Sequence, residues 1–284
     1  MKKALILSGG GGRGAYQVGA QKAFEEYGIK PDIICGTSIG AINAALLVSG
    51  FNASSLEDLW LSLKRKNVFK VAFWRRLFKK WPGQPRPLFS TEPLRKLLEE
   101  HLNIEEIRNK NTELYIPAIS AERSKLSVFS NEDITVEHIM ASAAIPLVFP
   151  AISLAGEHYW DGGLMANTPL LPALDSGATE VFVILLSPYG KGSMKMPRNR
   201  FEALETTLDL VLAASFRSLL KALDPERLGP SHYQVSWKGQ KVAIRILEPK
   251  EHLGLGTILN LSEKKTLELI AEGEADAKEL LSLI

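Results

Sequence analysis

Short apolar runs alternate with amphipathic stretches over the first part of the chain. Ala4–Leu7 predicts a buried strand, and the stretch from Ala15 to about Tyr27 predicts a helix. A second pair follows, with a strand predicted at Ile33–Cys35 and an apolar helix at 41–48. Further strand-like runs and a C-terminal helix are predicted at Glu113–Ile119, Glu180–Leu186, Lys241–Leu247 and Ser262–Leu283. This alternation predicts a three-layer α/β/α fold, in which helices cover both faces of a mostly parallel central sheet.

The length and composition favour one domain over residues 1–284. With 284 residues and 45% hydrophobic content, the chain can bury a full core. We expect residues from about 200 to 284 to form a C-terminal helical extension. The net charge of +2 predicts no partner by itself, and the single cysteine fits a reducing compartment. The first apolar run is too short for a signal peptide and no run is long enough to span a membrane, so we expect a cytoplasmic protein.

Consecutive glycines, Gly9 to Gly12, follow the first predicted strand and lead through Arg13 and Gly14 into a helix. Such glycines leave backbone N–H groups unshielded, so these groups can converge on an oxyanion or a phosphate. The same residues also satisfy the dinucleotide-binding pattern G-x-G-x-x-G. That alternative needs an acid at the end of the second strand, whereas the nearby Asp32 begins that strand. We therefore favour an oxyanion loop, with a dinucleotide-binding module as the alternative.

A serine stands on the turn between the second predicted strand and the second predicted helix, within Gly36-Thr37-Ser38-Ile39-Gly40. This is the G-x-S-x-G nucleophile elbow, which holds its serine on a sharp turn. A side chain at Gly36 or Gly40 would crowd that turn. The Ser38 hydroxyl would project near a helix N-terminus, whose partial positive charge favours a developing anion. The bare pattern is common by chance, but its position between a strand and a helix indicates a nucleophile.

A serine nucleophile needs a proton acceptor, and Asp161-Gly162-Gly163 supplies the best candidate. Asp161 follows the strand-like segment Glu157–Trp160, and the glycine pair would let another backbone approach it. The plain alternative is an aspartate that begins a turn. The five histidines lack distinctive surroundings, so we expect surface or structural roles for His101, His138, His158, His232 and His252.

Taken together and in this order, the motifs resemble those of the patatin-like phospholipase family. The glycine-rich loop G-G-G-x-[KR]-G of that family matches Gly9–Gly14. Its G-x-S-x-G elbow matches Gly36–Gly40, and its D-G-[GA] motif matches Asp161–Gly163. The segment Ala141–Pro150 also resembles the block that these proteins carry before the aspartate. The similarity runs from about residue 3 to about residue 190.

The resemblance implies a serine lipid acyl hydrolase of the phospholipase A, lysophospholipase or esterase type that needs no cofactor. By this analogy Ser38 attacks the acyl carbonyl of a lipid ester, and Asp161 accepts its proton directly. Backbone N–H groups of Gly10 to Gly12 would hold the oxyanion, and water would hydrolyse the acyl-enzyme. Arg13 would either face a phosphate head group or brace the loop. The family includes calcium-independent enzymes and the chain has no EF-hand-like loop, so we expect no metal.

Residues 59–91 depart from the charge balance of the chain. This segment carries nine basic residues and no acidic one, so the remainder has 34 − 9 = 25 basic residues against 32 acidic ones. Its aromatic and leucine side chains at 69, 73, 77 and 81 would share one face of a helix. Basic residues beside an aromatic face are typical of a helix at an anionic membrane surface, which predicts peripheral membrane contact. A cap that packs its aromatics onto the domain is the open alternative, and we expect no nucleic-acid binding.

A second enzymatic alternative is an α/β-hydrolase with a Ser–Asp–His triad. Ser38, Asp161 and either His232 or His252 follow the chain order of that fold. Against this alternative, only two predicted strands and one helix precede the elbow, whereas that fold places its elbow after several strands.

Overall fold

The computed structural model describes residues 1–64, 68–71, 87–187, 196–229, 231–250 and 261–283. Much of the basic and aromatic segment 59–91, including positions 73, 77 and 81, lies outside the described residues, as does His252. The helical face predicted for that segment therefore stays a prediction.

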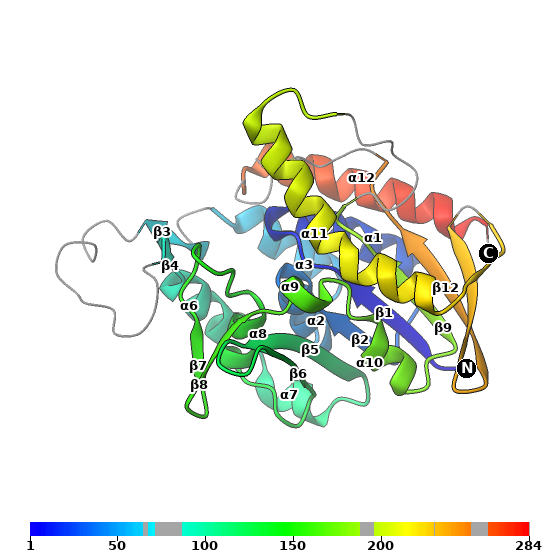
Figure 1. Cartoon of the computed structure of the whole chain (residues 1–284), viewed down its shortest axis with the longest axis horizontal. Helices are drawn as coiled ribbons and strands as arrows, with labels where there is room; N and C mark the ends of the chain where they lie inside the picture. Colours follow the sequence, from blue (N-terminus) through cyan, green and yellow to red (C-terminus); the bar gives the residue numbers. More distant parts are fainter. Residues whose placement is uncertain (65–67, 72–86, 188–195, 230, 251–260, 284) are drawn as a thin grey trace.

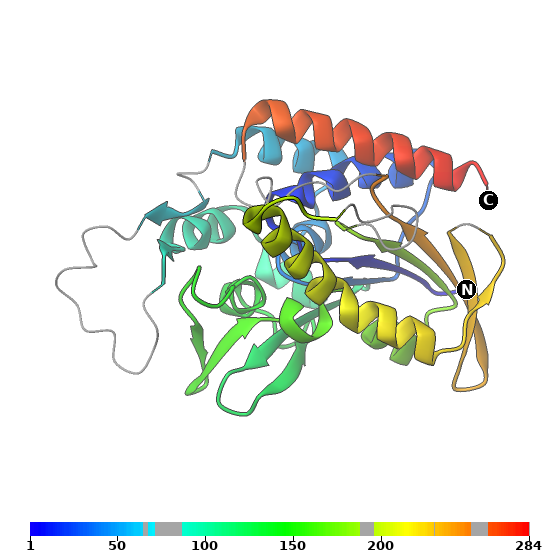
Figure 2. The same ribbon diagram turned by 45° about the horizontal axis from the view of Figure 1, so that its top comes forward.

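Five parallel strands form the centre of the molecule (Figures 1 and 2). Their order across the sheet is β12, β9, β1, β2 and β5. They span β12 (Gln240–Leu247), β9 (Glu180–Ile184), β1 (Lys3–Leu7), β2 (Ile33–Gly36) and β5 (Glu113–Ser120). Because these strands are parallel, their carboxyl ends meet at one edge of the sheet, and loops from several strands can build a site there.

Antiparallel strands extend this sheet at both of its edges. On one side, β11 (His232–Trp237) pairs with β12, and β10 (Glu226–Arg227) pairs with β11. On the other side, β5 pairs with both β6 (Lys125–Phe129) and β8 (Glu157–Asp161), and β8 pairs with β7 (Ile152–Leu154). The short strands β3 (Lys70–Val71) and β4 (Phe89–Ser90) form a separate ladder.

Successive side chains along each strand point to opposite faces of the sheet, so each strand contributes to two separate cores. In β1, Leu5 and Leu7 join a core on one face of the sheet, and Ala4 and Ile6 join a core on the other. The first core is covered by α1 (Ala15–Glu26), α2 (Ile39–Val48), α3 (Ala53–Ser62), α6 (Glu92–His101), α7 (Ile104–Asn109), α8 (Val136–Ser142) and α12 (Glu263–Leu281). The second is covered by α10 (Leu170–Asp175) and α11 (Arg200–Ala222). The three-layer fold predicted from the alternation is confirmed.

The C-terminal region differs from the helical extension predicted for residues 200–284. Between α11 and α12 the chain forms β10, β11 and β12, and β12 pairs in parallel with β9 of the central sheet. The alternating apolar residues of β12, such as Val242 and Ile244, are buried, which is why this stretch joins the sheet. This region is therefore part of the main sheet as well as of its helical layers.

Candidate active site

Ser38 occupies a strained turn between β2 and α2. Its backbone has φ 57° and ψ −122°, a conformation that residues other than glycine rarely adopt. The flanking glycines are required by close packing. A Cβ at Gly36 would lie 2.2 Å from the Gly40 carbonyl oxygen, and a Cβ at Gly40 would lie 2.2 Å from the Leu7 carbonyl oxygen. The turn thus presents the serine at the carboxyl end of β2, as a nucleophile elbow does.

The register of the sheet brings Asp161 to this turn. Cys35 of β2 pairs with Tyr115 of β5, so the same register continued by three residues puts Ser38 level with Ala118. Ala118 in turn pairs with Asp161 at the end of β8. The Ser38 hydroxyl lies close enough to the Asp161 carboxyl group to stabilise its ionised form. Two residues 123 positions apart therefore meet because both lie beside the second half of β5.

Burial decides the electrostatics of Asp161. Its side chain is 5% exposed, and this desolvation raises the pKa of the carboxyl group from its ordinary 3.8 to about 6. The neighbouring Ser38 hydroxyl and the Gly163 N–H, which donates a hydrogen bond of 2.7 Å to Asp161 Oδ1, offset part of that increase in pKa. No cation within the described ranges forms an ion pair with Asp161. A carboxylate with a pKa near 6 is a better proton acceptor at neutral pH than an ordinary aspartate.

The glycine-rich loop also lies next to Ser38, since a Cβ on Gly9 would stand 3.0 Å from the Ser38 Cβ. Gly11–Gly14 form a short 3-10 helix, η1, and Gly9 donates its N–H to the Asn167 carbonyl oxygen at 3.1 Å. Gly11 and Gly12 line a pocket together with Ser38. Between described residues, no hydrogen bond uses the N–H groups of Gly10, Gly11 or Gly12 as donors. Of these three residues, Gly11 and Gly12 line the pocket beside Ser38, where an oxyanion loop would lie.

The Arg13 side chain is buried and forms an ion pair. Its side chain is 1% exposed, and its guanidinium donates to Asp209 Oδ1 at 2.7 Å and to the Leu186 carbonyl oxygen at 3.3 Å. A substrate-binding role for Arg13 is therefore unsupported by the geometry, because a buried guanidinium already held by a carboxylate cannot reach a phosphate in solvent. The geometry corresponds to the second role considered for this residue, bracing of the loop.

A pocket with an apolar lining opens beside Ser38. It contains about 790 Å³ of empty space, part of which is open to solvent. Apart from Ser38 and two glycines, the lining side chains are aliphatic or aromatic: Ile39, Ile42, Leu46, Leu59, Trp60, Leu63, Val68, Phe69, Leu94, Leu97, Ala143, Ile145, Phe149 and Leu261. Such a pocket favours an apolar chain over a charged or sugar-like ligand.

Three supporting residues were not identified from the sequence. The Ser38 N–H donates to Ser142 Oγ at 3.1 Å, and the Thr37 hydroxyl donates to the Ala166 carbonyl oxygen at 2.7 Å. The Asn167 side-chain oxygen lies within 2.4 Å of where a Cβ on Gly9 would stand. These contacts tie the elbow to α8 and to the segment after Asp161. Ser142 lies within the family-like block Ala141–Pro150, which was the only sequence signal that pointed toward it.

The described histidines do not complete a triad. His232 lies on β11, four strands from β2, which is about 19 Å at the usual strand spacing. His158 contacts Glu122, and His138 contacts Thr135 and stacks on Phe129. No described histidine hydrogen bonds to Ser38 or Asp161. The triad alternative is therefore wrong for His232, whereas His252 lies outside the described residues.

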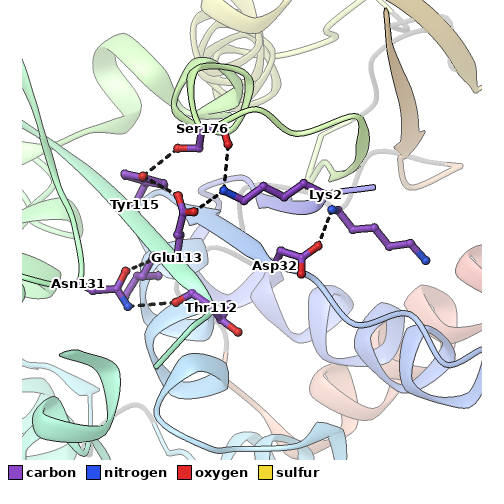
Figure 3. A network of polar contacts seen from close by, with 9 residues as sticks. Lys2, Asp32, Thr112, Glu113, Tyr115, Asn131 and Ser176 are labelled. Atoms are coloured by element: carbon purple, nitrogen blue, oxygen red, sulfur yellow. Dashed lines mark hydrogen bonds and ion pairs between the residues drawn. The ribbon is translucent and has the colours of Figure 1, made fainter. Parts of the chain in front are cut away.

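Asp32 lies beside Lys2 and Glu113, at the end of the sheet where β1 and β5 begin (Figure 3). Its carboxylate accepts a hydrogen bond of 2.7 Å from the Lys3 N–H, at the start of β1, whereas the loop follows the end of β1. A ribose held by Asp32 could not place its phosphates on Gly9–Gly14, because the length of the strand separates the two. The dinucleotide alternative is therefore wrong in this respect.

The described residues provide neither a metal-binding cluster nor a membrane-spanning helix. No group of three or more histidine, cysteine, aspartate or glutamate side chains within them is arranged to hold a metal ion. Among the described helices, we find none with the length and apolarity of a membrane-spanning segment.

A serine on a strained turn, a buried carboxylate near it and a glycine-rich loop that lines the same pocket as the serine form an arrangement of the kind that serine hydrolases use. A family model for patatin-like phospholipases matches residues 5–174. The chain belongs to the patatin-like phospholipase family, which confirms the resemblance noted from its motifs.

Two relatives and one solved structure illustrate this similarity. A cGAMP-activated phospholipase of Escherichia coli (strain TW11681) is 28% identical over 192 residues, covering 59% of this chain and 53% of that protein. The probable lipid hydrolase 463L of Invertebrate iridescent virus 6 is 30% identical over 186 residues, covering 59% and 62%. The chain thus matches only about half to three fifths of these relatives. Human GIVD cytosolic phospholipase A2 in complex with methyl gamma-linolenyl fluorophosphonate has the same fold, with a TM-score of 0.53, 11% identity, and coverage of 99% of this chain and 57% of that one.

Proposed function

We propose that the protein is a serine acyl hydrolase that cleaves carboxylic esters of lipids, with Ser38 as nucleophile and Asp161 as general base. The observation that carries this proposal is that Ser38 lines a pocket with an otherwise apolar lining and lies next to the buried Asp161 carboxyl group. The family of the chain and the names of its relatives, which include phospholipases and a lipid hydrolase, support the same class of substrate.

In the proposed reaction, Ser38 Oγ forms a bond to the ester carbonyl carbon while its proton passes to the Asp161 carboxylate. The carbonyl oxygen becomes an oxyanion that accepts hydrogen bonds from N–H groups among Gly10 to Gly12, and each such donor is worth roughly 3 kcal/mol in comparable enzymes. The intermediate then breaks its bond to the alcohol, which leaves with the proton from Asp161. Water repeats the sequence on the acyl-enzyme and releases a fatty acid.

The pocket suits the acyl chain of such an ester. Ile39, Ile42 and Leu46 lie along one side of α2, at spacings that share a helix face, and all three line the pocket. From Ser38 to Leu46 the helix rises by about 12 Å at 1.5 Å per residue. An extended chain spans ~1.2 Å per bond, so roughly ten bonds of an acyl chain reach the level of Leu46.

The direct test is a panel of lipid and synthetic esters assayed with the purified wild-type protein and with Ser38→Ala. We expect the wild type to release fatty acid and to react covalently with a fluorophosphonate, and we expect Ser38→Ala to do neither. Labelling that survives Ser38→Ala would remove Ser38 as the nucleophile. A wild type that neither hydrolyses any ester nor becomes labelled would refute the proposed function.

A second test addresses the use of the pocket. Leu46→Phe adds bulk to the inner part of the pocket, so we expect roughly tenfold slower hydrolysis of long-chain esters and little change for a short-chain ester. Val48→Ile is the matched control, since Val48 is buried on the same helix but does not line the pocket. Equal loss of activity on both esters in Leu46→Phe would contradict an acyl-chain role.

We further propose that residues 59–91 bring the protein to anionic membranes. In the described parts of this segment, Trp60 and Phe69 are buried and line the pocket, whereas Lys64 and Lys70 are exposed. This division, with aromatic side chains at the pocket and lysines at the surface, supports a role of the segment in bringing the active site to a lipid surface. Each cation near an anionic surface contributes about 1 kcal/mol to binding.

The membrane proposal is tested with vesicles that contain anionic lipid. Replacing Lys79 and Lys80 by glutamine should weaken vesicle binding by more than it slows hydrolysis of a soluble short-chain ester. Replacing Lys238 and Lys241, which are exposed on the β11–β12 hairpin, is the matched control for charge. Equal loss of binding and hydrolysis, or equal loss of binding in the control, would count against a membrane role for the segment.

A further inference from the structure

Helix α11 lies beyond the part of the chain that the family model matches, yet it contacts both halves of the candidate active site. The matched region ends at residue 174, whereas α11 spans Arg200–Ala222. Its Asp209 holds Arg13 of η1, and its Leu212 lies 3.6 Å from where a Cβ on Gly163 would stand. One helix thus touches the glycine-rich loop and the turn that follows Asp161.

The contact with η1 is a buried ion pair in a fixed set of hydrogen bonds. The Arg13 and Asp209 side chains are 1% and 3% exposed, and Arg13 Nη1 lies 2.7 Å from Asp209 Oδ1. The Ser187 hydroxyl donates to the same carboxylate oxygen at 2.9 Å, and the same nitrogen donates to the Leu186 carbonyl oxygen. Charge-assisted hydrogen bonds of this kind have narrow geometry, so they restrict where the Arg13 backbone can lie.

The position of the Arg13 backbone determines where the adjacent amides point. Arg13 directly follows Gly12 within η1, and the preceding glycines have no side chains of their own to hold the loop. Glycine is the residue that loses most conformational freedom on folding, so a run of glycines needs an external anchor to keep its N–H groups aimed at one place. The Arg13–Asp209 pair supplies such an anchor one residue away from the proposed donors.

We propose that Asp209 is a positioning residue for the oxyanion hole: through Arg13 it holds the N–H groups of Gly11 and Gly12 in the geometry that stabilises the transition state. This inference rests on the proposed function. Asp209 touches no substrate, so its loss should impair the stabilisation of the oxyanion and leave the binding of the unreacted ester unchanged.

The test compares Asp209→Asn with the wild type on a soluble short-chain ester and on two ligands of equal chain length. One ligand is a trifluoromethyl ketone, whose adduct with serine carries an oxyanion, and the other is an ether that cannot react. We expect Asp209→Asn to lower kcat roughly 10- to 100-fold and to weaken ketone binding in proportion. KM and the affinity for the ether should stay within about twofold of the wild type.

Two further variants separate positioning from folding. Glu180→Gln breaks the Arg245–Glu180 pair, whose side chains are 12% and 11% exposed, at the amino end of β9 and away from the site. It should lower the thermal midpoint without changing kcat. The double variant Arg13→Met with Asp209→Leu replaces the ion pair by apolar groups, which buried sites often tolerate, so it provides a folded protein if Asp209→Asn does not fold. It should show the same losses of kcat and ketone affinity.

Wild-type kcat and ketone affinity in Asp209→Asn, or in the Arg13→Met, Asp209→Leu double variant if Asp209→Asn does not fold, would overturn the positioning role. A parallel loss of ether affinity and ketone affinity would also overturn it, because that result indicates general damage to the pocket. These results differ from a failure of the proposed function itself. In that case the wild type would show neither hydrolysis nor labelling by a fluorophosphonate.

Discussion

The carboxylates near the two ends of the central sheet have pKa values that are shifted in opposite directions. At the amino ends of β1, β2 and β5, Glu113 lies in a polar network with Lys2, Tyr115 and the Ser176 carbonyl oxygen (Figure 3). Burial alone would raise the pKa of Glu113, but hydrogen bonds from Lys2 and Tyr115 outweigh it and lower that pKa. At the carboxyl ends, burial raises the pKa of Asp161 to about 6.

The difference lies in what surrounds each carboxylate. Glu113 is about a third exposed and has a lysine partner, so its charge is stabilised and the group serves the structure. Asp161 is 5% exposed and contacts a serine hydroxyl on a strained turn. A buried carboxylate with few partners that stabilise its charge has a raised pKa and therefore accepts a proton readily. A general base requires this property.

The largest expected contrast is in activity. Asp161→Asn should lower kcat/KM for an ester by about a thousandfold or more, because an amide cannot accept the proton of Ser38. Glu113→Gln, which removes a carboxylate at the other end of the same sheet, should stay within about twofold of the wild type. Steady-state kinetics on a soluble ester measures both variants. If Asp161→Asn kept a kcat/KM close to that of the wild type, the proposed Ser38–Asp161 dyad would be ruled out.

The next contrast is in stability and has an unusual sign. Ionising Asp161 destabilises the folded protein as pH rises from the ordinary pKa of 3.8 to the folded pKa of about 6. Asp161→Asn avoids that penalty, so its free energy of unfolding at pH 8 should exceed that of the wild type by about 3 kcal/mol. At pH 3 the Asp161 carboxyl group of the wild type is protonated and as neutral as asparagine, so the difference in the free energy of unfolding should vanish. Urea unfolding at the two pH values checks this, and a destabilised variant at pH 8 would contradict the raised pKa.

The same pKa predicts the pH dependence of the reaction. Only the ionised form of Asp161 accepts a proton, so kcat/KM should fall about tenfold per pH unit below a midpoint near pH 6. A pH–rate profile on an ester whose own chemistry does not change between pH 4.5 and 8 measures this limb. A midpoint near pH 4 would mean that Asp161 is not desolvated during catalysis, or that another group is the base.

The smallest expected effect lies at the amino end of the sheet. Glu113→Gln should lower the free energy of unfolding at pH 7 by less than about 1 kcal/mol, because Glu113 and Lys2 are partly exposed and screened by solvent. Since the folded pKa of Glu113 is lowered, its contribution is present above its ordinary pKa of 4.5 and is lost as pH falls through the folded pKa. Denaturant titrations at pH 7 and pH 3 measure this, and an undiminished difference at pH 3 would contradict the ion pair as its cause.

Local features of the structure were predictable because their causes are local. The strands Ala4–Leu7 and Ile33–Cys35 were predicted from apolar runs and are confirmed as β1 and β2. The turn at Ser38 was predicted from two glycines, and each of them packs against backbone where no Cβ fits. Steric restrictions of this kind act over a few residues, so the sequence pattern carries them directly.

Contacts between distant parts of the chain were not predictable in the same way. The Ser38 N–H meets Ser142, 104 residues away, and Arg13 meets Asp209, 196 residues away. The role of Arg13 was left open between a head group and the loop, and only its burial against Asp209 distinguishes the two. The strand at Lys241–Leu247 was predicted and is confirmed as β12, but its pairing with β9 in the main sheet was not predicted.

By itself, the sequence determined which segments form strands and helices, where the backbone is strained, and which serine and aspartate have motifs around them. These properties depend on side-chain periodicity and on steric limits within a few residues. Only the tertiary structure decided that Asp161 is desolvated, that the pocket beside Ser38 is lined by apolar side chains, and that α11 anchors the glycine-rich loop. Desolvation and pocket shape depend on which residues cover a group, and the packing of the whole chain sets that cover.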